Sequence, residues 1–219
     1  MVGKARPPYV LVHGFADTAQ TWDPLIAFLT DSDVHVWDLP GHGERSSSSD
    51  PMPLDRDETV RELVNKISAL GAPVTLVGHS LGGYLALMTT IENPDLVASI
   101  ALISSGPGFR NATARSEWNA YIDSIAASTS MSRESTEIAY QPDSYVIDNL
   151  AAIDAPLVHI IGSRDRRYRA GADYLQKILP KSNLFEIEGA GHHPQRTHPA
   201  EVAKYIVESR QSLLDAGGN

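Results

Sequence analysis

The sequence predicts an α/β fold, a mostly parallel sheet of about six strands with helices on both faces. Short runs of β-branched and other apolar residues alternate with longer segments of helical apolar spacing. Each short run is followed by glycine, proline or a polar turn. A chain of 219 residues is long enough for one domain with a substantial core.

The expected elements alternate along the chain. The strand candidates are residues 9–12, 34–38, 74–77, 99–103, 157–161 and 184–187. The helix candidates are residues 21–29, 59–70, 81–91, 170–179 and 199–214. The third helix is expected to end near Asn93, because Pro94 cannot continue it. We expect a serine-rich loop at residues 46–49 and a frayed tail at residues 215–219.

One segment interrupts the alternation. Residues 110–149 separate the fourth and fifth strand candidates, where a plain crossover needs only about a dozen residues. Within it, apolar residues at helical spacing form one face, made of Trp118, Tyr121, Ile122 and Ile125. We therefore predict a core domain of residues 1–109 and 150–219, with residues 110–149 as a short cap insertion of one to three helices.

Composition and charge exclude several classes. The net charge of −9 repels a phosphate backbone, so we expect no nucleic-acid partner. The lack of cysteine excludes a disulfide framework, a thiolate zinc site and a cysteine nucleophile. No apolar run approaches the roughly 18 residues of a membrane span, and residues 9–12 are too short for a signal peptide. We expect a cytoplasmic protein, and the sequence does not predict its oligomeric state.

The most informative segment is Gly-His-Ser-Leu-Gly at residues 78–82, between the third strand and the next helix. A serine there lies in a sharp, strained turn, and the two flanking glycines leave room for it, as in a nucleophile elbow. The Ser80 hydroxyl would be exposed above the sheet, beside the N-terminal dipole of the helix that begins at Leu81. The alternative is a glycine-rich turn with an incidental serine.

A catalytic serine needs a base that is itself oriented by a carboxylate, and in a parallel sheet such residues follow the carboxyl ends of strands. Asp165 directly follows the fifth strand and is the candidate acid. Asp154 precedes the same strand and lies at the wrong end. The alternative for Asp165 is a turn or capping residue, drawn into ion pairs by its neighbouring arginines.

Eight histidines compete for the role of base. His192 follows the last strand on a glycine-containing loop that can carry the ring back toward Ser80, and its neighbour His193 is the strongest alternative. Because no histidine spacing with a carboxylate matches a metal site, we expect no metal. The histidines expected to satisfy backbone groups near the site are His13, His42 and His79. Those expected on strands or at the surface are His35, His159 and His198.

Together these motifs resemble the α/β-hydrolase family from Tyr9 to Ile206. The further matching segments are residues 13–15 (His-Gly-Phe), 38–43 (Asp-Leu-Pro-Gly-His-Gly), 162–165 (Gly-Ser-Arg-Asp) and 189–192 (Gly-Ala-Gly-His). The resemblance implies the α/β-hydrolase fold and a triad of Ser80, Asp165 and His192, in the chain order typical of this fold.

The resemblance also implies an oxyanion hole made by the main-chain N–H groups of Phe15 and Leu81, two donors aimed at a developing negative charge. We expect Phe15 and His79 to contact substrate, with Trp118 and Tyr121 of the insertion as the opposing wall. For Trp118, a separate hydrophobic cluster is an equal alternative.

We therefore expect a cofactor-independent serine hydrolase that cleaves small to medium carboxylic esters of a small-molecule acyl substrate through an acyl-enzyme. Ser80 would attack the carbonyl, His192 would move the proton and Asp165 would hold the imidazole. Two alternatives stay open, because a fold does not choose a reaction. Residues 38–43 are similar to the small menaquinone-pathway members of the family, in which the triad acts as a base, so one alternative is a lyase or C–C hydrolase. The other is a ligand receptor with a slow triad.

Overall fold

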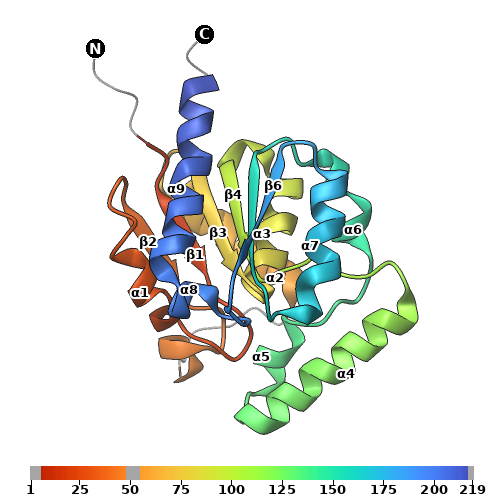
Figure 1. The fold of residues 1–219 in the computed structure, drawn as a ribbon. Helices are drawn as coiled ribbons and strands as arrows, with labels where there is room; N and C mark the ends of the chain where they lie inside the picture. Colours follow the sequence, from red (N-terminus) through yellow and green to blue (C-terminus); the bar gives the residue numbers. More distant parts are fainter. Residues whose placement is uncertain (1–5, 48–54, 217–219) are drawn as a thin grey trace.

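The computed structural model describes residues 6–47 and 55–216, in which six strands form one sheet with helices around it (Figure 1). The strands are β1 (Tyr9–Val12), β2 (Val34–Trp37), β3 (Val74–His79), β4 (Val97–Ile103), β5 (Leu157–Gly162) and β6 (Ser182–Ile187). Their order is β2-β1-β3-β4-β5-β6, and every neighbouring pair is parallel. The predicted fold class is confirmed.

The helices connect these strands along the chain. The α-helices are α1 (Asp23–Ile26), α2 (Arg56–Ser68), α3 (Leu81–Glu92), α4 (Ala112–Thr129), α5 (Arg133–Glu137), α6 (Tyr145–Asp148), α7 (Arg166–Ile178), α8 (Pro194–Thr197) and α9 (Pro199–Ala216). Short 3₁₀ turns are η1 (Ala19–Trp22), η2 (Gly43–Ser47), η3 (Pro94–Leu96) and η4 (Leu150–Ala152). None of the helices in the described ranges has the length and apolar character needed to cross a membrane.

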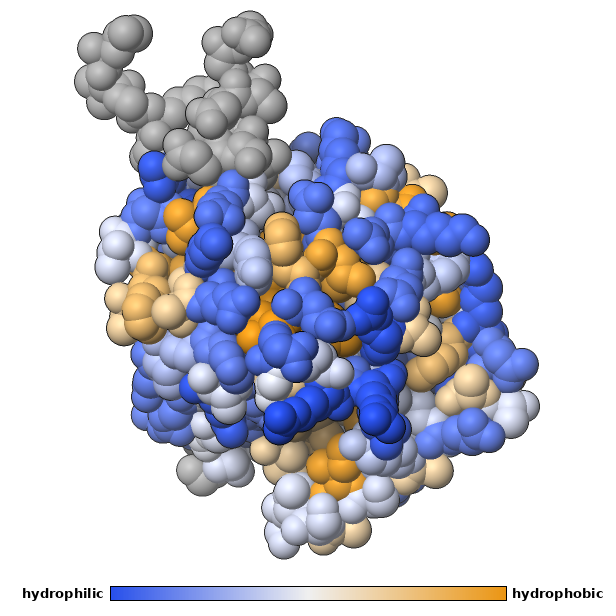
Figure 2. Space-filling view, viewed as in Figure 1, coloured by the Kyte–Doolittle hydropathy of each residue, from blue (hydrophilic) through white to orange (hydrophobic). Residues whose placement is uncertain are grey.

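The core consists of two apolar layers, one on each face of the sheet. Alternate side chains of a strand point to opposite faces. In β1, Tyr9 and Leu11 therefore pack in the layer that contains α1 and α9. Val10 and Val12 pack in the other layer, which contains α2, α3 and α7. Hydrophilic residues cover most of the face shown in Figure 2, with apolar patches between them.

Three helices differ from the prediction at their N-terminal ends. Helix α2 begins at Arg56 rather than at residue 59. The helix expected at residues 21–29 is a 3₁₀ turn followed by the single turn α1, because Pro24 has no N–H and is accommodated only in a first turn. Helix α7 begins at Arg166 rather than at residue 170, with Asp165 at its N-cap position. The earlier start places Tyr168 in the first turn of α7.

Residues 110–149 contain α4, α5 and α6, and α4 projects beyond the sheet (Figure 1). This segment is tied to the core through Arg56, whose side chain is only 4% exposed. Arg56 donates hydrogen bonds to both carboxylate oxygens of Asp143, at 2.9 and 3.0 Å, and to Asp57 at 2.7 Å. It also donates to the hydroxyl of Tyr84 in α3, at 3.1 Å.

The N-terminal segment and α9 meet at the amino ends of the strands. Arg210 donates a hydrogen bond to the carbonyl of Pro7, and its guanidinium lies 3.9 Å from the centre of the Tyr9 ring. The Tyr9 hydroxyl donates to Asp31 at 2.8 Å. The expected tail at residues 215–219 and the serine loop at residues 46–49 lie partly outside the described residues.

Candidate active site

Ser80 lies in a strained turn between β3 and α3. Its φ of 52° and ψ of −115° are unusual for a residue with a side chain. A Cβ atom at Gly78 would collide with the backbone of Gly82, and one at Gly82 would collide with the backbone of Val12. The two glycines therefore allow the close packing that forces the turn, and the Ser80 side chain is presented at the carboxyl edge of the sheet.

Asp165 and His192 meet at the same edge, from the loops after β5 and β6. The Nδ1 atom of His192 lies 2.8 Å from Oδ2 of Asp165, whose side chain is 5% exposed. No arginine forms an ion pair with Asp165 among the described residues; the guanidinium of Arg167 instead lies 3.8 Å from the centre of the Tyr121 ring. With Nδ1 donating to the carboxylate, Nε2 is left as the basic nitrogen.

The two alternatives weighed for the acid and the base have other partners. Asp154 bonds to Lys181 at 2.7 Å, and its side chain is 90% exposed. The Nε2 atom of His193 lies 3.8 Å from Oδ2 of Asp17, and burial lowers the pKa of His193. Neither side chain is bonded to the Asp165–His192 pair.

The three histidines expected to satisfy backbone groups around the site are His13, His42 and His79, and each is hydrogen-bonded to the main chain. Nε2 of His13 accepts a hydrogen bond from the Leu39 N–H at 3.0 Å. The His42 ring is bonded to the Pro40 carbonyl at 2.8 Å, and burial lowers the pKa of His42 to about 4.

His79, just before Ser80, is buried, and its Nε2 lies 2.9 Å from the main-chain oxygen of His192. Burial holds the pKa of His79 well below its usual value. The neutral ring therefore fixes the backbone that carries His192. His159 lies in strand β5, in line with the expectation of a strand or surface position, and burial lowers the pKa of His159 to about 4.

Tyr168 is a site residue that sequence reasoning missed. Its hydroxyl is 3.1 Å from Ser80 Oγ, and its ring stacks on the His192 imidazole at 4.7 Å with an interplanar angle of 19°. Within the described chain no hydrogen bond joins Ser80 to His192. No local pattern in the sequence marked Tyr168, because the first turn of α7 has no apolar periodicity.

The loop after β1 packs directly on the elbow. A Cβ atom at Gly14 would lie 3.1 Å from the Cβ of Ser80, so glycine is needed for this approach. In the described part of the chain, the main-chain N–H groups of Phe15 and Leu81 have no acceptor. For Leu81 this follows from its place as first residue of α3. Two unpaired donors beside Ser80 can receive negative charge on a substrate oxygen.

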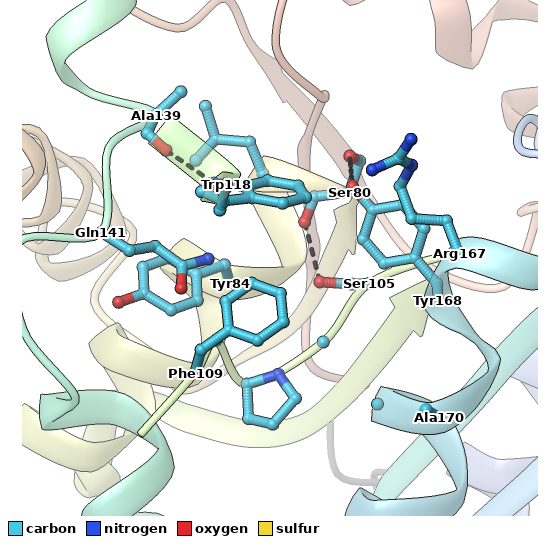
Figure 3. A pocket seen from close by; sticks show the side chains of 15 residues that line it. Ser80, Tyr84, Ser105, Phe109, Trp118, Ala139, Gln141, Arg167, Tyr168 and Ala170 are labelled. Carbon is cyan, nitrogen blue, oxygen red and sulfur yellow. Dashed lines mark hydrogen bonds between the residues drawn. The ribbon is translucent and has the colours of Figure 1, made fainter. Parts of the chain in front are cut away.

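Two cavities meet at Ser80. The first has a volume of about 140 Å³ and is mainly apolar; Trp118 and Phe109 line it, and Gln141 adds a polar group opposite Ser80 (Figure 3). The second has a volume of about 370 Å³. The residues expected to contact substrate all line this second cavity: Phe15, His79, Trp118 and Tyr121.

Trp118 lies between the two cavities and is anchored at the same time. Its Nε1 donates to the carbonyl of Ala139 at 3.2 Å, while its ring faces Tyr168 edge-on at 6.2 Å. Trp118 therefore lines both cavities and also packs against the main apolar core, and not in the separate hydrophobic cluster that was the alternative.

Among the residues that the structure describes, one group of side chains could hold a cation. Asp17, His79 and His193 each place a ligand atom within 4.8 Å of the others. The guanidinium of Arg196 already bonds to Asp17. Its positive charge opposes a metal ion at this position.

Comparisons with known proteins cover nearly the whole chain. Residues 9–205 match the model of the alpha/beta hydrolase family. The 2-succinyl-6-hydroxy-2,4-cyclohexadiene-1-carboxylate synthase of Salmonella arizonae is 27% identical over 253 residues, which cover 95% of this chain and 96% of that protein. The synthase of the same name from Escherichia coli (strain ATCC 8739) is 28% identical over 251 residues, covering 94% and 95%. The structure of MenH from S. aureus has a TM-score of 0.85 at 20% identity, covering 97% of this chain and 96% of that chain.

The expectation of an enzyme for small to medium carboxylic esters is wrong. Relatives of full length are named for a cyclohexadiene-carboxylate synthase, which agrees with the lyase-type alternative. The physical reason is that an oriented imidazole and two oxyanion donors serve any reaction that develops negative charge on oxygen, so these motifs do not specify the bond that breaks. They do specify the kind of protein: with its six parallel strands and a family match over residues 9–205, this chain belongs to the alpha/beta hydrolase family of hydrolase-type enzymes.

Proposed function

We propose that this chain catalyses the formation of a cyclic diene carboxylate, as its relatives are named for, by an elimination in which His192 is the base. The observation that carries the proposal is the state of the imidazole. Asp165 orients the His192 ring, and the His192 side chain is one-third exposed. The Ser80 hydroxyl is hydrogen-bonded to Tyr168 rather than to His192. An oriented imidazole that is free of the serine is suited to take a proton from substrate.

The relatives' product name describes a ring with two double bonds, a hydroxyl, a carboxylate and a succinyl group. We propose that His192 Nε2 removes a proton from the ring carbon beside the succinyl carbonyl. The electron pair of that C–H bond moves toward the carbonyl oxygen and then forms the new C=C bond. The leaving group departs with the electrons of its own bond to the ring and receives a proton in turn, which returns His192 to its neutral form.

The remaining site residues are assigned from this step. Asp165 stabilises the imidazolium that forms when His192 takes the proton. The main-chain N–H groups of Phe15 and Leu81 would hold the enolate oxygen, and each such donor contributes roughly 3–4 kcal/mol in related sites. Ser80 places its hydroxyl at the edge of the same oxyanion site.

We assign substrate selection to residues 110–149 as a cap over the core of residues 1–109 and 150–219. Trp118 and Tyr121 of α4 line the cavity next to Ser80. An arginine lines each cavity, Arg167 the first and Arg196 the second. The proposed substrate carries one carboxylate on its ring and one on its succinyl group, and arginines are suited to bind such groups.

The test supplies the purified protein with the precursor whose elimination yields 2-succinyl-6-hydroxy-2,4-cyclohexadiene-1-carboxylate. Appearance of the conjugated diene is followed by ultraviolet absorbance and the product is identified by mass spectrometry. We expect turnover well above the spontaneous rate, reduced about 10²- to 10⁴-fold in His192→Ala, the usual contribution of a general base.

A rate equal to the spontaneous one would refute the proposal. A reaction in ¹⁸O-labelled water distinguishes elimination from C–C bond hydrolysis. Hydrolysis places solvent oxygen in a product, and elimination does not. Asp165→Asn, which favours the wrong imidazole tautomer, should also lower kcat, by no more than His192→Ala does, because Asp165 acts only through His192.

A further inference from the structure

Tyr168 contacts both reactive side chains of the site. It lies in the first turn of α7 and lines both cavities. Its hydroxyl is 3.1 Å from Ser80 Oγ (Figure 3). Its ring lies nearly parallel to the imidazole of His192, with ring centres 4.7 Å apart. The Tyr168 side chain therefore contacts Ser80 through its hydroxyl and His192 through the face of its ring.

The surroundings of Tyr168 keep it in this position. Trp118 packs against it edge-on, with ring centres 6.2 Å apart. Burial raises the pKa of Tyr168 above its usual value, so its hydroxyl keeps its proton at neutral pH. At neutral pH the hydroxyl is thus an uncharged hydrogen-bonding group beside Ser80.

The hydrogen bond to Tyr168 fixes where the Ser80 hydroxyl lies. Held there, Ser80 Oγ forms no hydrogen bond with His192 in the described chain. A serine becomes a strong nucleophile only when a base takes its proton. The contact with Tyr168 therefore opposes nucleophilic chemistry and leaves the imidazole open to a proton of the substrate.

We propose that Tyr168 is a positioning residue that selects base chemistry over nucleophilic chemistry at this triad, its hydroxyl restraining Ser80 and its ring orienting His192. This inference rests on the proposed function, because only an elimination gains from a His192 imidazole that is not bonded to Ser80. The two parts of the side chain act separately. Phenylalanine keeps the ring and removes the hydroxyl, whereas leucine removes both.

The experiment compares Tyr168→Phe and Tyr168→Leu with the wild-type protein and with Tyr174→Phe. The control removes a hydroxyl from the same helix, α7, at a residue whose ring faces Arg110 and lies outside both cavities. Two quantities are measured for each protein: the rate at which a fluorophosphonate probe labels Ser80, and kcat and KM for the elimination. Thermal unfolding shows that each variant is folded.

The two measurements should move in opposite directions in Tyr168→Phe. Labelling of Ser80 should rise about three- to tenfold, the effect of one neutral hydrogen bond, because the serine is released toward His192. The kcat for elimination should fall by a similar factor while KM stays within about twofold. Tyr168→Leu should label more slowly than Tyr168→Phe and lose further kcat, since the imidazole is no longer held. Tyr174→Phe should match the wild type in both.

A labelling rate in Tyr168→Phe that equals or falls below that of the wild type would overturn the proposal, because the hydroxyl would then exert no restraint on Ser80. A purely structural role predicts parallel losses of labelling and kcat in both Tyr168 variants, which also contradicts it. If the wild type catalyses no elimination, the proposed function fails, and the labelling comparison still decides whether Tyr168 restrains the serine.

Discussion

Asp143→Asn should weaken the attachment of the 110–149 segment to the core. In a fully buried ion pair, removal of one partner costs about 3–5 kcal/mol, because a charge is left buried without compensation. Arg56 is 4% exposed, but the Asp143 side chain is 49% exposed and Arg56 keeps its bond to Asp57. Solvent screening therefore reduces the expected loss of unfolding free energy to about 1–2 kcal/mol.

This loss should lower the unfolding midpoint by about 2–8 °C in a protein of this size. Its pH dependence has a definite sign. The hydrogen bonds from Arg56 hold the pKa of Asp143 below its ordinary value of 3.8. The stabilisation is therefore complete well above that value and is lost as pH falls through the folded-state pKa. The deficit of the variant should be full at pH 7 and should shrink as the pH drops below about 4.

Thermal unfolding followed by circular dichroism between pH 3 and pH 7 checks both points. Asp148→Asn is the matched control, since it removes a carboxylate from an exposed pair with Arg110 in the same segment. Exposed pairs contribute little, so its midpoint should stay close to that of the wild type. Equal midpoints for Asp143→Asn and the wild type at pH 7 would refute the reasoning, as would a deficit that persists undiminished at pH 3.

Three further outcomes are expected. His192→Ala should lose nearly all elimination activity in steady-state kinetics while His193→Ala keeps most of it, and the reverse result would move the base to His193. Trp118→Ala should raise KM severalfold more than it lowers kcat, because it opens both cavities to water; a lower melting temperature with unchanged KM would reduce Trp118 to an anchor. Dialysis against EDTA should leave turnover unchanged, since Arg196 already bonds to Asp17; a loss that zinc reverses would show a metal requirement.

The sequence could predict those parts of the site that depend on residues close together in the chain. Glycines flanking Ser80 mark its turn, and the carboxyl ends of parallel strands converge, so Asp165 and His192 could be expected to meet. The structure brings them to 2.8 Å. The strand positions were predicted on the same basis, because buried parallel strands appear as short apolar runs.

Other parts have no local signal. The first turn of α7 consists of arginines and Tyr168, without apolar periodicity, so the start of the helix was placed too late and the contact with Ser80 was missed. The bond between Arg56 and Asp143 joins residues 87 positions apart, which no spacing reveals. The reaction itself was misjudged, because a triad records how charge is stabilised and not which substrate is held.

The contact between α9 and the start of the chain has a consequence for biosynthesis. Arg210 bonds to Pro7 across 203 positions, and α9 covers the face of β1 that carries Tyr9 and Leu11. During translation the helix that shields β1 leaves the ribosome about two hundred residues after β1. The nascent chain must therefore keep an apolar strand from aggregating until α9 is made, and the sheet closes slowly, as expected for non-local parallel pairing.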